Sequence, residues 1–99
     1  MSGALGLGID AGGTTTRWAL AQEGGIVVAE GAAAGMTGVQ LLSDHGRAAL
    51  GEALAGLGAE VLRHGHPVAV CAGFTGLDQR ADDLAAMIAS VLGVQASAV

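Results

Sequence analysis

The stretch GLGIDAGGTTTRWAL, residues 6–20, contains two runs in which apolar side chains alternate with small or polar ones. In the first run Leu7 and Ile9 alternate with glycines, and in the second Trp18 and Leu20 alternate with small or polar residues. Strict alternation is typical of a β-strand that buries one face, and a Gly-Gly pair between two such runs marks a turn. The stretch therefore predicts a β-hairpin.

The rest of the chain predicts two further strands and two helices. Residues 26–35 continue as a third strand after the turn QEGG, and residues 37–65 show the three-or-four spacing of a helix packed on a sheet. Residues 67–74, PVAVCAGF, form a continuous apolar run, which is typical of a central parallel strand buried on both faces. A second helix fits residues 78–93, and VQASAV, residues 94–99, opens another strand.

This order, β-β-β-α-β-α, predicts one α/β domain with a mixed sheet over residues 1–99. Thr37 and Gln40 match a capping box at the start of the first helix. Four glycines interrupt this helix at about 1 kcal/mol each relative to alanine, so we expect it to depend on tertiary packing. The side chains expected to face the sheet are Val39, Leu42, Ala49, Ala53, Leu57 and Val61.

Strand alternation also sorts the notable single side chains of this region. Thr16 and Trp18 share one face of the second strand, and Arg17 lies on the other. We therefore expect Trp18 in the core and interpret Arg17 as a surface or partner contact. Cys71, inside the apolar run, is expected to be a small buried hydrophobe.

Composition excludes several classes of protein. The chain has 99 residues, no lysine and a net charge of −5, with one Trp, one Phe and no Tyr. Neither a basic patch nor an aromatic stacking platform is present, so we do not expect general nucleic-acid binding. The single cysteine suits a reducing cytoplasm. The N-terminus has no basic region of a signal peptide, and the longest uncharged tract, residues 84–99, is too short and polar to span a membrane.

The hairpin has a composition suited to binding an anion. Asp10 ends the first strand on its glycine-lined face, and the amides of Gly12, Gly13 and Thr14 can form a concave anion site. The hydroxyls of Thr14 and Thr16 can add donors, and Asp10 can hold a hydrated Mg²⁺. The alternative is a tight turn in which Asp10 and Thr14 bond the backbone of the turn itself. The Walker A motif and the dinucleotide fingerprint are both absent.

At this point the residues resemble a known group. LGIDAGGTTTRWAL resembles the first phosphate motif of the sugar kinase/actin/Hsp70 superfamily, and the element order resembles its ribonuclease H-like half domain. GIDAGGTTTR, AGMTG and CAGFTGLDQRADDL are most similar to the N-acetylglucosamine kinase group. That group includes the BadF/BadG-type ATPases that activate 2-hydroxyacyl-CoA dehydratases and benzoyl-CoA reductase. The resemblance implies ATP-dependent phosphorylation of an amino-sugar hydroxyl, with Mg²⁺.

The resemblance also implies roles for individual residues. It assigns the metal to Asp10, the phosphates to residues 12–14, and sugar contacts to Thr37, Gly73 and Gly76. Thr37 stands where the human-type kinases have a sugar-contacting Asn, and it has a second interpretation as a helix cap. The two glycines have a second interpretation as a strand-to-helix turn.

In kinases of this group, the catalytic Asp, the second phosphate motif and the adenosine pocket follow the region that this chain covers. Asp78, Asp82 and Asp83 do not match the catalytic position and suit a solvated helix start. A strand begun at Val94 also has little room before Val99. We therefore expect the N-terminal half of a kinase-like protein, inactive as this chain alone.

Three other functions are consistent with parts of the sequence. A dehydratase-activating ATPase would need cluster-ligating cysteines, and Cys71 does not lie in such a context. A ribonuclease H-like nuclease would need several carboxylates around two metals, and VAVCAGF supplies none. A non-catalytic module could dock on another subunit or form a homodimer through an unfinished sheet edge.

Overall fold

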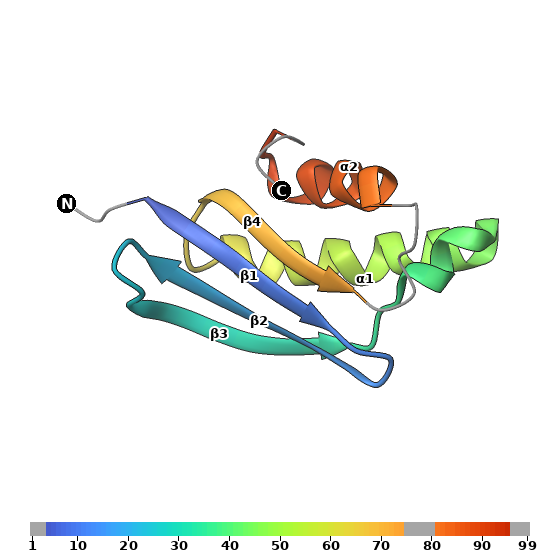
Figure 1. Ribbon diagram of the computed structural model, residues 1–99, viewed down its shortest axis with the longest axis horizontal. Helices are drawn as coiled ribbons and strands as arrows, with labels where there is room; N and C mark the ends of the chain where they lie inside the picture. Colours follow the sequence, from blue (N-terminus) through green and yellow to red (C-terminus); the bar gives the residue numbers. More distant parts are fainter. Residues whose placement is uncertain (1–3, 75–80, 96–99) are drawn as a thin grey trace.

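The computed structural model describes residues 4–74 and 81–95 as a small mixed α/β domain with a four-stranded sheet and two α-helices (Figure 1). The elements are β1 (Leu5–Ala11), β2 (Thr15–Gln22), β3 (Val27–Ala34), the 3₁₀ helix η1 (Gly38–Leu42), α1 (Asp44–Leu62), β4 (Pro67–Phe74) and α2 (Ala81–Leu92). Their order confirms the predicted β-β-β-α-β-α sequence. None of the helices in this part of the chain is long and apolar enough to cross a membrane.

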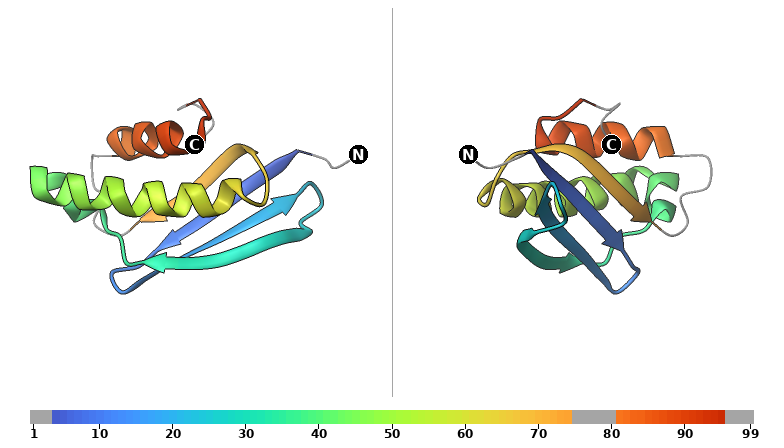
Figure 2. Two further views of the ribbon diagram at one scale, coloured as in Figure 1. Left: turned by 180° about the vertical axis from the view of Figure 1, so that it is seen from behind. Right: turned by 60° about the vertical axis from the view of Figure 1, so that its left-hand side comes forward.

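The sheet has the strand order β3-β2-β1-β4, with β4 parallel to β1 and the other two pairs antiparallel. The predicted hairpin is confirmed: β1 and β2 pair over their whole length, from Leu5 opposite Gln22 to Ala11 opposite Thr16. Both α-helices lie on one side of the sheet (Figure 2). The strands therefore have an inner face toward the helices and an outer face that no described element covers.

The core lies between the inner face and the helices. Trp18, expected in the core, is 4% exposed. The helical contribution comes from Leu50, Leu54, Leu57 and Val61 of α1 and from Leu84, Ile88 and Leu92 of α2. Helix α1 also packs closely on α2, since a side chain at Gly58 would come within 3.1 Å of the Val91 carbonyl oxygen.

The predicted helix over residues 37–65 is in fact two helices. The capping box of Thr37 and Gln40 is confirmed, but it caps η1, and Ser43 then caps α1 by accepting a 3.0 Å hydrogen bond from the Gly46 amide. This break resets the helical phase. Leu57 and Val61 of α1 are buried as expected, whereas Val39 and Leu42, which precede the break, are exposed. Ala49 follows the break and is also exposed, because the buried stripe of α1 passes through its neighbour Leu50.

Strand β4 is not the doubly buried central strand that its apolar run predicts. It pairs with β1 alone among the described strands, and Val68, Cys71 and Gly73 are exposed on it. The expectation of a buried Cys71 is therefore wrong. The reason is that both helices cover the same face of the sheet, so alternate residues of β4 remain outside.

The strand expected at residues 94–99 does not form at Val94 and Gln95, the two of these residues that the structure describes. Gly93 takes a left-handed conformation with φ of 68°, which commonly ends a helix. The Val94 amide then bonds the Ala89 carbonyl at 3.1 Å, and neither Val94 nor Gln95 lies in a strand. The remaining residues, 96–99, lie outside the described part.

The large core side chain Trp18 fits because Gly31 lies directly opposite it on β3. A Cβ at Gly31 would be 2.8 Å from two atoms of the indole ring. We therefore expect Gly31→Ala to lower the free energy of unfolding by about 1–3 kcal/mol through overpacking, measured by urea denaturation. Gly6→Ala is the matched control, because a Cβ at Gly6 meets nothing within 4 Å. Equal stability of the two variants would contradict this account of the core.

Candidate functional site

The predicted site residues that the structure describes come from three segments at one edge of the sheet. Strands β1 and β4 are parallel, with Asp10 beside Gly73, and β3 runs in the same direction because both β1 and β3 are antiparallel to β2. The carboxyl ends of all three strands therefore lie near the β1–β2 turn (Figure 1). Thr37 follows β3 at the same edge. Gly76, assigned to the sugar, lies outside the described residues.

The β1–β2 turn is held from both sides. The Gly12 amide donates a 3.0 Å hydrogen bond to the Thr15 carbonyl, and the Gly12 carbonyl accepts one of 3.0 Å from the Met36 amide. Gly35 packs so closely on the turn that a Cβ there would collide with the Gly13 carbonyl. The segment after β3 therefore fixes the turn, and a glycine is sterically required at position 35.

Two of the three predicted phosphate-binding amides are free. Among the hydrogen bonds of the described part of the chain, none uses the amides of Gly13 or Thr14, and both residues are exposed. The Gly12 amide is already hydrogen-bonded inside the turn, so it is not available to a phosphate as the sequence predicted. The positive-φ glycines of the described residues are Gly24, Gly25 and Gly93, so residues 12 and 13 do not use the left-handed conformation that a Gly-Gly turn permits.

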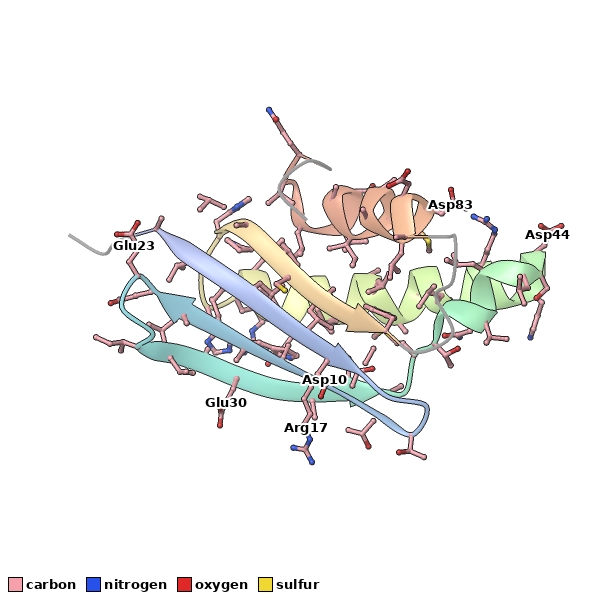
Figure 3. All side chains as sticks on the ribbon, in the orientation of Figure 1. Asp10, Arg17, Glu23, Glu30, Asp44 and Asp83 are labelled. Atoms are coloured by element: carbon pink, nitrogen blue, oxygen red, sulfur yellow. The ribbon has the colours of Figure 1, made fainter. Side chains whose placement is uncertain are left out.

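Asp10 is exposed on the outer face of the sheet, where it lies directly opposite Arg17. Figure 3 shows both side chains on this face, with Glu30 of β3 nearby. The three side chains line a hollow of about 580 Å³ with a floor of small residues. No salt bridge within the described ranges involves any of the three, so their charged groups are open to a ligand.

Arg17 is the residue that sequence reasoning placed outside the site. Its expected exposure is confirmed, but its position beside Asp10 was missed. The signal was present in the sequence. In a hairpin, residues on facing positions point to the same side of the sheet, and a short turn between residues 11 and 16 places Asp10 opposite Arg17.

Thr16 is placed on the opposite face from Asp10 and must be removed from the predicted set. Its side chain is fully buried on the helix side, in register between Ala11 and Ala33. Among the residues that the structure describes, the Oγ1 atom of Thr16 has no hydrogen-bond partner. It therefore cannot serve a ligand at the turn without a change in the fold.

Thr37 and Gly73 have different local roles. The Thr37 hydroxyl accepts a 2.9 Å hydrogen bond from the Val39 amide, while the Thr37 amide donates to Gln40 Oε1 at 2.9 Å. The cap interpretation of Thr37 is thus confirmed, and its hydroxyl proton remains available as a donor. Gly73 is an exposed residue within β4, so its alternative interpretation as a strand-to-helix turn is wrong.

A metal at this edge would have few protein ligands. Within residues 4–74 and 81–95, no three His, Cys, Asp or Glu side chains are grouped closely enough to hold a metal ion. Mg²⁺ commonly keeps several waters and uses one or two carboxylates together with substrate phosphates. Asp10 alone fits that kind of site, and it does not fit a metal bound by protein ligands only.

Comparison with models of known protein families finds no match to this sequence, and comparison with curated proteins finds no significant match.

The conclusion that Thr16 does not belong to the site can be tested by removing its buried hydroxyl. An unsatisfied buried hydroxyl is unfavourable, so we expect Thr16→Val to raise the free energy of unfolding by about 1 kcal/mol, measured by urea denaturation. Thr15→Val is the matched control, since Thr15 is exposed and should change stability little. A loss of stability in Thr16→Val would show that the hydroxyl has a partner.

Proposed function

We propose that this chain is the ribonuclease H-like, actin-like N-terminal half of an ATP-dependent amino-sugar kinase, and that the turn at residues 12–14 binds the phosphates of Mg-ATP. The observation that carries the proposal is the pair of free, exposed amides at Gly13 and Thr14, on a fixed turn near Asp10 and Arg17. The element order and the motif GIDAGGTTTR support the same assignment.

The charges of the chain make a metal necessary in this proposal. The chain has no lysine and a net charge of −5, so a triphosphate would otherwise be repelled. Arg17 supplies a guanidinium group, which suits bidentate contact with a phosphate. Asp10 holds the hydrated Mg²⁺, which neutralises the remaining phosphate charge. The two free amides then orient the phosphate oxygens, and because amides are neutral they leave the net charge of the site unchanged.

The sugar would lie at the same edge, near Thr37 and Gly73. The hydroxyl proton of Thr37 can donate to a sugar oxygen while its oxygen still caps η1. Gly73 leaves space, because a Cβ at this position meets nothing within 4 Å. Both features are compatible with a polar ring bound beside the phosphates.

The first test is a Mg-ATP titration of the wild type and Asp10→Asn by calorimetry. We expect the substitution to weaken Mg-ATP binding at least tenfold, about 1.4 kcal/mol, because the neutral amide holds Mg²⁺ poorly. Binding of ATP in EDTA should change little. The matched control is Asp82→Asn, which makes the same change on the exposed first turn of α2. Equal affinities of wild type and Asp10→Asn for Mg-ATP would refute the phosphate site.

The second test concerns turnover. A kinase needs a base within hydrogen-bond reach of the acceptor hydroxyl. In the part of the chain that the structure describes, the carboxylate at the turn is Asp10, which the proposal assigns to Mg²⁺ and not to proton transfer. The carboxylate of Glu30 lies two strands away from β1. We therefore expect no sugar phosphate when this chain alone is incubated with Mg-ATP and N-acetylglucosamine or glucosamine. Product above a protein-free control would contradict this expectation.

A further inference from the structure

The outer face of the sheet holds two adjoining hollows, of about 580 and 520 Å³, that share Gly8. The register shows why they are continuous, because small residues stand side by side across the strands. Across β2, β1 and β4 the rows are Ala19, Gly8 and Cys71, and then Ala21, Gly6 and Ala69, and Glu30 of β3 stands at the end of the first row. No described element covers these rows (Figure 2), so a long, shallow groove follows β1.

The glycines of the outer face are not required by the packing of the described residues. At Gly6 and Gly8 of the groove and at Gly73 beside Asp10, an added Cβ meets no described atom closer than 4.0 Å, and none of the three has a left-handed φ. At Gly31 and Gly35, in contrast, an added Cβ would collide with Trp18 and with the β1–β2 turn, respectively. Glycine weakens a strand and often marks the close approach of a ligand or another backbone. The three outer glycines therefore indicate an approach from outside.

Strand β4 gives a second, independent indication. Every residue of PVAVCAGF is apolar or glycine, a pattern typical of strands covered on both faces. Yet Val68 is 59% exposed and Cys71 is exposed on the outer side. The apolar outer face of β4 thus continues the groove of β1.

We propose that the outer face of β1 and β4 binds an amphipathic helix of a partner protein, with its apolar side on Gly6, Gly8 and Cys71 and with basic residues at its flanks. The two hollows are open and follow the length of β1, a shape that accommodates an elongated protein segment. A helix of about 18 residues is about 27 Å long, which matches the roughly 25 Å of a seven- or eight-residue strand.

The charges around the groove determine which charge the flanks of the partner helix should carry. Among the described residues, Asp10, Glu23 and Glu30 lie around the outer face against one guanidinium, that of Arg17 (Figure 3). Complementary charge speeds association and excludes wrong partners, so the helix carries Lys or Arg at its flanks.

A second copy of this chain is a poorer occupant because of its charge. Each copy carries a net charge of −5, so two copies repel each other, whereas a helix with basic flanks is attracted to the acidic face.

The test uses synthetic helical peptides of about 18 residues, with a Leu/Ala face and either Lys or Glu on the opposite face. We expect saturable binding of the Lys peptide, at least tenfold tighter than the Glu peptide. Alkylation of Cys71, the single thiol, should slow in the complex. In an NMR titration, the shifted amides should be those of Gly6, Gly8 and Gly73.

Substitutions test where the peptide binds. Gly8→Leu fills the groove without a clash inside the chain, so it should weaken the Lys peptide at least tenfold while thermal stability is kept. Gly56→Leu is the matched control at an exposed, uncrowded glycine of α1, and it should change affinity less than twofold.

Three results would overturn the proposal: equal affinity of wild type and Gly8→Leu, absence of saturable binding up to about 1 mM peptide, or a dimer that protects Cys71 without peptide. None of these results depends on ATP binding, so the proposal stands or falls separately from the phosphate site.

Discussion

The period-two alternation of β1 and β2 is the constraint on which the rest of the structure depends. It places Leu7, Ile9, Trp18 and Leu20 under the helices, and it leaves Asp10 and Arg17 on the outer face. A slip of one residue in the pairing would exchange the two sets, burying two charges and exposing the core. The same alternation that forms the core therefore determines which side chains can meet a ligand.

The turn between these strands could be predicted only in part. An acid, two glycines and a threonine after a strand indicated the hairpin and its exposed edge. The sequence could not show that the Met36 amide and Gly35 would hold the turn from the side, because these residues lie more than twenty positions away in the chain. That long-range contact gives the Gly12 carbonyl its hydrogen bond from Met36, and it explains why position 35 is a glycine. The Gly12 amide is lost to the predicted phosphate site for a local reason, since it donates to the Thr15 carbonyl within the turn.

Errors at single residues have three physical sources. Thr16 was assigned to the ligand by its hydroxyl and its neighbours in sequence, although its strand face already placed it beside Trp18 in the core. The apolar run of β4 predicted a strand covered on both faces, and local sequence does not tell which elements provide that cover. The helix register failed for a third, local reason, since Ser43 can cap a helix and so restart its phase.

The two proposed binding surfaces meet at Asp10 and Arg17, and this adjacency has a physical consequence. Both residues line the hollow that adjoins the groove at Gly8, and both stand beside the turn that carries the free amides. A triphosphate with Mg²⁺ at Asp10 and Arg17 would occupy part of the hollow that a helix lying over Gly8 would also fill. Because the two ligands would compete for this space, each would lower the affinity of the other by the same factor, as linkage requires. The outer face of β1 would thus connect nucleotide binding to partner binding without any movement of the helices.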